Sequence, residues 1–269
     1  MLVDFHYHLT TYDTAVADLI ADMDRSGVEV TNLFGGPADA FWEHKNCWFA
    51  SNEKVLAAVR EHAGRLVGSV FLDPCDPDAV DTFKRYRDEG FRGVKMFPAS
   101  GYYPDEERFF PLYELIEEAG MPLLFHAGQT NIRVIGANPA VRRATSTKYG
   151  LPVNFDGVAR FFPKMTIVLA HMGYPYYIEA WSVAHANPNV YLDISGSGPW
   201  TEGIPVFFNA VGGHNFIPID FRRVLWGTDN CLTQAEHHAR SDVYMRQMGA
   251  KVEDRKMIFG ETAKKLLNL

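Results

Sequence analysis

Eight short apolar segments, separated mostly by helical patterns, constrain the fold of this chain more than any other feature. Most of them are continuously apolar, which is typical of strands covered on both faces in a parallel sheet. Between the first two, apolar residues from Val16 to Met23 recur at i, i+3, i+4 and i+7, as on one face of a helix. The predicted strands are Leu2–Phe5, Val28–Phe34, Leu66–Leu72, Gly93–Phe97, Pro122–Phe125, Thr166–Ala170, Val190–Ile194 and Val224–Gly227.

Strands that alternate with helices over 269 residues predict a (β/α)8 barrel, with residues 1–269 as a single domain. A doubly wound open sheet is the rival architecture. It usually carries a glycine-rich phosphate turn after the first strand. In this chain His6-Tyr7-His8 stands at that place. The barrel is therefore favoured.

Composition and charge exclude several classes of protein. The net charge of −7 and the pI near 5.8 disfavour general nucleic-acid binding, which needs a basic face. No apolar run reaches the roughly 18–20 residues that span a bilayer, so no membrane partner is expected. Residues 1–4 do not begin a signal peptide, and three scattered cysteines do not form a disulfide framework. We expect a cytoplasmic protein.

Polar side chains that can bind metal ions fall at the carboxyl ends of several predicted strands. Active sites of (β/α)8 barrels assemble on that face, where these side chains would lie close together. A histidine buried behind an apolar strand is costly without a partner, and convergence on one rim supplies partners. The residues in question are His6, His8, Lys95, His126, His171 and Asp229.

Each residue of this set also has a plainer interpretation when it is taken alone. Two histidines at i, i+2 arise by chance about 0.4 times in such a chain, although alternation does place both on one face of a strand. His126 could cap the barrel, and Asp229 could be a loop carboxylate. The other histidines are interpreted as surface or loop residues: His44, His62, His185, His214, His237 and His238.

The ordered set of motifs resembles the amidohydrolase superfamily, in its amidohydrolase-related branch of metal-dependent hydrolases. That branch also contains non-oxidative decarboxylases similar to aminocarboxymuconate semialdehyde decarboxylase. The resemblance covers essentially the whole chain. It rests on the segments Val3–His8, Gly93–Lys95, Pro122–Gly128, Ala170–Gly173, Asn189–Ser195, Gly227–Asp229 and Ile258–Ala263.

The resemblance implies a role for each rim residue. It identifies one divalent ion, usually zinc, with the ligands His6, His8, His126 and Asp229. It makes His171 a group that acts on substrate or water in enzymes with one ion, or a ligand of a second ion in enzymes with two. Phe97 departs from the branch's usual Gly-x-Lys-x-His-Pro motif, where a histidine stands. Lys95 is therefore interpreted as a clamp for a substrate carboxylate, with a metal-bridging carbamate and a structural lysine as alternatives.

Three functions are compatible with this chemistry. Three imidazoles and a carboxylate leave a position on zinc for water, whose pKa falls to about 7, so the favoured function is hydrolysis of a C–N or C–O bond in a small molecule. Asp229 would take a proton, and His171 would hold an oxygen or protonate a leaving group. The second function is metal-assisted decarboxylation of an unsaturated or aromatic acid. A non-catalytic metal-binding protein is the third and least favoured.

Two loops suggest features of the substrate. Residues 35–50 include Phe41, Trp42, Trp48 and Phe49, which predict either a flap that packs on the barrel or on a second subunit of a homodimer, or an aromatic wall for a ring substrate. Cys231 is interpreted as a bystander. Residues 127–155 carry four basic residues and no acidic one. Arg142 and Arg143, with Lys95, are therefore predicted to bind a small anionic substrate through its carboxylate. The alternative is that the basic side chains of this loop face solvent or pair with acidic helices elsewhere.

Overall fold

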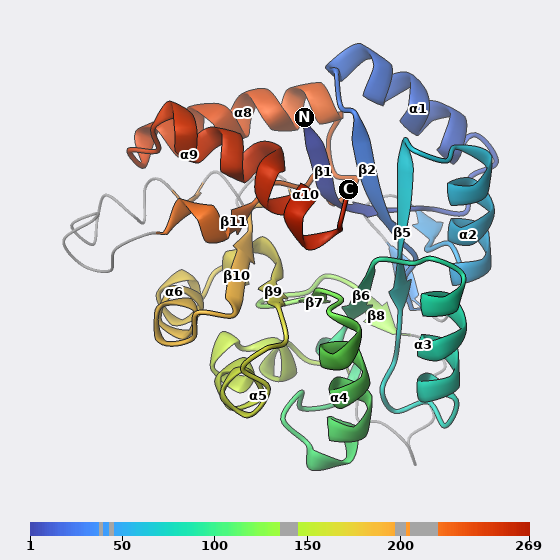
Figure 1. Cartoon of the computed structure of the whole chain (residues 1–269), viewed down its shortest axis with the longest axis vertical. Coiled ribbons are helices and arrows are strands. Elements are labelled where there is room, and N and C mark those ends of the chain that lie inside the picture. The colour runs from blue at the N-terminus through green and yellow to red at the C-terminus, as the bar shows by residue number, and fades with distance from the viewer. Residues whose placement is uncertain (38–39, 43–45, 135–144, 197–202, 205–219) are drawn as a thin grey trace.

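A computed structural model describes the chain except for residues 38–39, 43–45, 135–144, 197–202 and 205–219. Eight parallel strands form its central sheet, and helices surround them (Figure 1). The predicted (β/α)8 barrel is confirmed, and each predicted strand overlaps an observed one. In spatial order the strands are β1 (Val3–His8), β2 (Val30–Phe34), β5 (Leu66–Phe71), β6 (Gly93–Met96), β7 (Leu123–Phe125), β9 (Ile167–Leu169), β10 (Val190–Asp193) and β11 (Val224–Leu225).

Capping residues mark the ends of some of the helices. The Ser51 hydroxyl accepts the Lys54 N–H at the start of α2, and Gly120 ends α4 in the left-handed region, with φ +64°. Within the described residues the helices are α1 (Ala15–Ser26), α2 (Asn52–Glu61), α3 (Ala79–Asp88), α4 (Phe110–Ala119), α5 (Asp156–Phe161), α6 (Tyr177–Ala186), α8 (Gln234–Gln247), α9 (Val252–Lys256) and α10 (Thr262–Leu266). None of them is long and apolar enough to cross a membrane.

A second, three-stranded antiparallel sheet lies outside the barrel and was not predicted. It joins β3 (Ala40–Trp42), β4 (Cys47–Trp48) and β8 (Arg133–Val134), with β3 in the centre. Its strands come from the segments that follow β2 and β7. Because both segments leave the carboxyl ends of barrel strands, this small sheet is on the face of the predicted site.

The barrel interior is filled by apolar side chains from β1, β2, β7, β9 and β11. Ala263 in α10 and Leu267, just after this helix, complete the cluster, and both are fully buried. The packed interior leaves the mouth as the place for polar chemistry. The cluster consists of Val3, Phe5, Val30, Phe34, Leu124, Val168, Ala170, Leu225, Ala263 and Leu267.

The seam between β1 and β11 is closed by a buried carboxylate as well as by backbone contacts. The Phe5 N–H donates to the Trp226 carbonyl at 3.0 Å, and the Asp229 N–H donates to the His6 carbonyl at 2.7 Å. The Asp4 carboxylate accepts from the backbone N–H groups of Thr228 and His6, from the Thr228 hydroxyl and from the Gln234 amide. Asp4 therefore joins the first strand to the loop that carries Asp229.

We expect Asp4→Ala to lower the free energy of unfolding by about 3 kcal/mol, because it leaves several buried donors without their acceptor. The matched control is Asp13→Ala, which removes an exposed carboxylate from the segment before α1. Urea unfolding followed by circular dichroism measures both variants. If Asp4→Ala lowers the free energy of unfolding by less than about 1 kcal/mol, the hydrogen bonds of Asp4 across the seam are not a main source of stability.

Candidate active site

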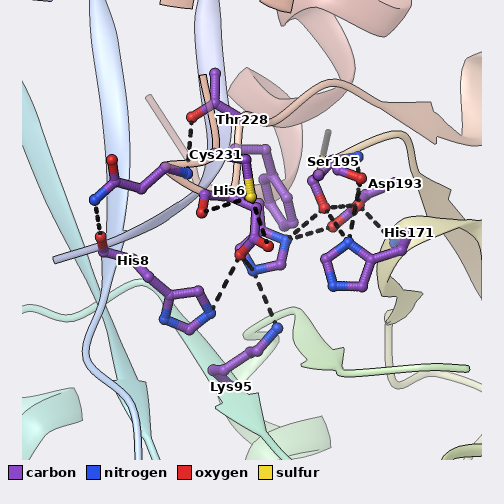
Figure 2. A network of polar contacts seen from close by, with 12 residues as sticks. His6, His8, Lys95, His171, Asp193, Ser195, Thr228 and Cys231 are labelled. Atoms are coloured by element: carbon purple, nitrogen blue, oxygen red, sulfur yellow. Dashed lines mark hydrogen bonds and ion pairs between the residues drawn. The ribbon is translucent and has the colours of Figure 1, made fainter. Parts of the chain in front are cut away.

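Of the predicted rim residues, His6, His8, Lys95 and His171 lie close together in Figure 2. His6 and His8 belong to β1, Lys95 belongs to β6, and Asp229 follows β11. His126 follows β7, and His171 lies in the 3-10 turn Ala170–Gly173 after β9. The histidines and Lys95 are buried, and Asp229 is largely so. The carboxyl ends of five different strands therefore contribute to one site.

The neighbours of His6 determine which of its two ring nitrogens carries the hydrogen. Nδ1 lies 2.8 Å from the Asp193 carboxylate, to which it donates its hydrogen. Nε2 consequently carries the lone pair, and it lies 3.4 Å from an oxygen of Asp229. A carboxylate behind a histidine is the usual arrangement that orients a metal-binding imidazole.

His8 repeats this arrangement with a different acceptor. Its Nδ1–H donates to the Gly35 carbonyl at 2.6 Å, so Nε2 again carries the lone pair. That Nε2 lies 3.7 Å from the same Asp229 oxygen that faces His6. His6, His8 and Asp229 thus bring three ligand atoms within 4.8 Å of one another. Two imidazole lone pairs directed at one carboxylate fit a divalent ion such as zinc.

His126 lies near this group but outside it. Its Nε2–H donates to the Gln129 carbonyl at 3.0 Å, and its ring packs 4.9 Å from that of Phe97, measured between centroids. Among the described residues, no cluster of three ligand atoms within 4.8 Å includes His126. A ligand role would use Nδ1 or require the ring to turn, and it stays a prediction. Phe97 occupies the space beside His126 with an apolar ring.

His171 is held in a strained backbone conformation by two neighbours. Its φ of +58° lies in the left-handed region, which is unusual for a histidine and typical of functional sites. Its backbone N–H donates to Asp193 at 3.0 Å, and its Nδ1 lies 2.9 Å from the Ser195 hydroxyl. Nδ1 is thus engaged by Ser195, and the catalytic role of His171 stays a prediction. Asp229 has a similar φ of +56°.

Asp193 and Ser195 belong to the site, although their roles were not predicted from the sequence. The fully buried Asp193 carboxylate accepts from His6 Nδ1, from the backbone N–H groups of His171 and Ser195, and from the Ser195 hydroxyl. One carboxylate therefore orients both histidines. His6, His171 and Asp193 also form a compact cluster of potential ligands, but their hydrogen bonds already account for this proximity. The position of Asp193 at the carboxyl end of β10 was the available signal.

Lys95 contacts a predicted metal ligand directly. Its Nζ lies 3.0 Å from His6 Nε2, and its side chain is 1% exposed. Burial lowers the pKa of Lys95 to about 8, opposed by the charges of Asp229 and Asp193. Burial likewise raises the pKa of Asp229 to about 7, although the Lys95 ammonium opposes this. The clamp role assigned to Lys95 stays a prediction, because its observed partner is His6.

Burial also keeps the rim histidines neutral. It lowers the pKa values of His6, His8 and His171 well below the usual range, and it lowers that of His126 to about 3. The Lys95 ammonium adds to the effect at His6, His8 and His126. Neutral imidazole is the form that binds metal ions.

The aromatic segment after β2 packs against the site. The Trp42 and Phe49 rings are buried and stack at 5.1 Å between centroids, and Phe49 also lies 5.1 Å from the His8 ring. Trp48 is 42% exposed and packs on Phe41. The predicted flap on the barrel thus agrees with the packing of Trp42 and Phe49, which also form a wall beside His8.

Three further expectations concern residues around the rim. The Cys231 thiol lies 3.6 Å from the Asp229 carboxylate, and its interpretation as a bystander stays a prediction. Arg142 and Arg143 lie outside the described residues, as do His44 and His214. The surface or loop assignment is wrong for His237, which is buried in α8.

A (β/α)8 barrel with a buried His/Asp donor set at its mouth is an architecture of metal-dependent enzymes. A family model described as amidohydrolase matches residues 3–269. The chain belongs to the amidohydrolase family. Among curated proteins, no match to the chain was found.

Solved structures share the fold over nearly the whole chain. One is a probable 2-pyrone-4,6-dicarboxylic acid hydrolase from Acinetobacter baumannii with citric acid bound, at TM-score 0.67, 16% identity and coverage of 100% of this chain and 99% of that chain. A second is a 2,6-dihydroxybenzoate decarboxylase from Rhizobium, at TM-score 0.68 and 18% identity, with coverage of 99% of this chain and 98% of that chain. A third is an amidohydrolase from Burkholderia multivorans with bound zinc, at TM-score 0.70 and 12% identity, with coverage of 100% of this chain and 99% of that chain. At these identities the likeness concerns the fold alone.

Proposed function

We propose that this protein is a metal-dependent hydrolase that cleaves a C–N or C–O bond of a small, carboxylate-bearing substrate. The observation that carries the proposal is the convergence of His6 Nε2, His8 Nε2 and one Asp229 oxygen at the barrel mouth. A single domain over residues 1–269 would carry the whole site.

The proposed ligands of a single zinc ion are His6, His8, Asp229 and, as the fourth, His126. Bound zinc would act as a Lewis acid and lower the pKa of water to about 7. The Asp229 carboxylate lies at the donor set and would take a proton from the attacking water and pass it to the leaving group. His171 would exchange a proton through Nε2, since Nδ1 is held by Ser195. It would hold the developing negative oxygen only while Nε2 carries that proton.

Two observations support a carboxylate-bearing substrate. The related fold from Acinetobacter baumannii is that of a probable dicarboxylic acid hydrolase, and it was solved with citric acid bound. In this chain the basic residues Arg142 and Arg143 follow β7, where loops reach over the mouth, and Lys95 lies buried beneath it. We propose that these three residues bind the substrate carboxylate.

Decarboxylation of an aromatic acid is the second candidate function. It is favoured by the stacked Trp42 and Phe49 rings, which lie beside His8 and offer an apolar wall for a ring substrate. The same ligands would then orient the ring acid, and His171 would move the proton. The fold shared with a 2,6-dihydroxybenzoate decarboxylase supports the same class of substrate.

Product analysis distinguishes the two functions. The zinc-loaded protein is incubated with lactones and amides that carry carboxylates, with their neutral esters, and with hydroxylated benzoic acids. We expect ring opening or amide cleavage of the carboxylates without release of carbon dioxide. Carbon dioxide from the benzoic acids would make the enzyme a lyase. Faster turnover of the neutral esters than of every carboxylate would contradict the proposed substrate class.

Neutralising Arg142 and Arg143 together is expected to raise KM for the preferred carboxylate about tenfold or more, because a charge-assisted hydrogen bond contributes about 1.5–3 kcal/mol. The dependence of KM on salt should become flatter. The matched control is the double variant Arg85→Ala, Arg87→Ala on α3, which removes two exposed arginines on the outside of the barrel. If both double variants raise KM equally, the change reflects the general charge of the protein, and Arg142 and Arg143 do not bind the substrate carboxylate.

A further inference from the structure

Helix α8 begins with two buried polar side chains that are neither metal ligands nor part of the apolar core. Gln234 is 0% exposed and His237 is 2% exposed. Their spacing of i, i+3 places both on one face of the first turns, and Thr233 caps this helix by accepting the Glu236 N–H. Buried polar groups are costly unless they are hydrogen-bonded, so their partners indicate what they do.

His237 bridges two loops of the barrel. The Trp226 indole Nε1–H donates to His237 Nδ1 at 2.9 Å, and the Ser241 hydroxyl lies 3.2 Å from the same nitrogen. The His237 Nε2–H donates to the Gly196 carbonyl at 2.6 Å. An indole N–H only donates and a carbonyl only accepts, so the tautomer is fixed. Burial lowers the pKa of His237 to about 4, which keeps the ring neutral.

The two loops that His237 joins carry the proposed chemistry. Gly196 directly follows Ser195, whose hydroxyl contacts His171. Trp226 is three residues before Asp229 in the chain. Between them, Gly227 packs so closely on β1 that a Cβ there would lie 2.6 Å from the Cβ of His6. A shift of Trp226 would therefore be transmitted both to Asp229 and to His6.

Gln234 reaches the Asp229 loop from the β1 side. Its amide donates to the Asp4 carboxylate at 3.0 Å and to the Thr31 hydroxyl at 2.9 Å. Asp4 in turn accepts from the backbone N–H and the hydroxyl of Thr228, the residue before Asp229. The first turns of α8 thus contact both sides of the seam that lies under the site.

We propose that His237 is a positioning residue that sets the placement of Asp229 through Trp226 and of the Ser195–His171 pair through Gly196. Gln234 contributes to the placement of Asp229 through Asp4 and Thr228. The proposal rests on the proposed function for its turnover readout, whereas its metal and indole readouts need no substrate. The two contacts of His237 should separate into two effects, one on metal affinity and one on turnover.

Amide side chains can test the two contacts separately. His237→Asn keeps an oxygen near the position of Nδ1 and so an acceptor for Trp226, but it loses the donor to Gly196. His237→Gln places an amide nitrogen near the position of Nε2 and keeps the Gly196 contact, but it loses the acceptor for Trp226. His237→Leu keeps neither. His185→Leu, on the exposed face of α6, is the control.

Three readouts are compared across these variants. Titration of the metal-free protein with Co²⁺ gives metal affinity by visible absorption, and turnover is measured with the substrate that the product analysis identifies. Exchange of the Trp226 indole N–H with solvent, assigned with Trp226→Phe, reports the contact itself. Loss of an outer partner of a metal site typically costs about 10–100-fold in affinity or activity.

We expect His237→Gln to weaken Co²⁺ binding at least about tenfold with kcat retained at saturating metal, and to speed exchange of the indole N–H. We expect His237→Asn to retain Co²⁺ affinity and to lower kcat about tenfold or more without a matching change in KM. His237→Leu should show both losses. If it fails to fold, the two amide variants still decide the question.

The proposal is overturned if His237→Leu retains both metal affinity and turnover, or if all three variants lower the melting temperature without any change in the other readouts. It is also overturned if both amide variants lose affinity and turnover to the same extent. Absence of any hydrolysis by the wild type would contradict the proposed function alone, because Co²⁺ affinity and indole exchange would still test His237.

Discussion

Replacing His8 by alanine is expected to remove most of the bound metal while leaving the barrel folded. The variant deletes one of the two imidazole lone pairs that face Asp229. Zinc binding of about 10–16 kcal/mol shared over four ligands gives about 3 kcal/mol for each, or roughly a hundredfold in affinity. The folding cost is smaller, about 1 kcal/mol for the hydrogen bond to Gly35. Elemental analysis after dialysis measures the metal, and circular dichroism measures the fold.

His185→Ala is the matched control for His8→Ala, because His185 lies on the exposed face of α6. We expect this control to retain its metal and its melting temperature. The double variant His6→Ala, His8→Ala is the stronger test. If it still binds a full equivalent of zinc, the ligand assignment is wrong, whatever its activity.

His171→Asn is expected to lower turnover by roughly 10²–10⁴ while the metal is retained, which is the usual range for lost acid–base assistance. Asparagine is the suitable replacement for two reasons. It tolerates the left-handed φ of +58° better than most residues, and it keeps a polar atom near the Nδ1 that faces Ser195. The variant therefore removes Nε2 with little disturbance of the turn.

Metal content separates the alternatives for His171. Turnover and zinc per chain are measured on the same preparation, with His185→Asn as the control on α6. Loss of one of two bound ions in His171→Asn would show a binuclear site and make the single-ion interpretation wrong. Unchanged turnover would remove His171 from the chemistry altogether.

The sequence predicted the barrel because its strands are encoded locally. Each strand is a short apolar run, and the positions of His6, His126, His171 and Asp229 at strand ends follow from that pattern alone. The right-handed alternation of strand and helix then places all carboxyl ends on one face. The meeting of these residues at the mouth was thus predictable without knowledge of any distance.

Features that depend on distant partners were not predictable. His237 looks like one polar residue of an amphipathic helix, and only its contacts with Trp226 and Gly196 show why it is buried. Asp193 likewise acquires its role from His6, which is 187 residues away in the chain. The small sheet of β3, β4 and β8 pairs segments whose runs are only two or three residues long. Such short runs carry no periodic signal.

The central claim is that one divalent ion binds between β1 and the loop after β11. Anomalous scattering from a zinc-loaded crystal, measured on both sides of the zinc edge, tests it most directly. We predict a single peak about 2 Å from the Nε2 atoms of His6 and His8 and from a carboxylate oxygen of Asp229. A peak among His6 Nδ1, His171 and Asp193, or two peaks of equal height at the mouth, would contradict the account.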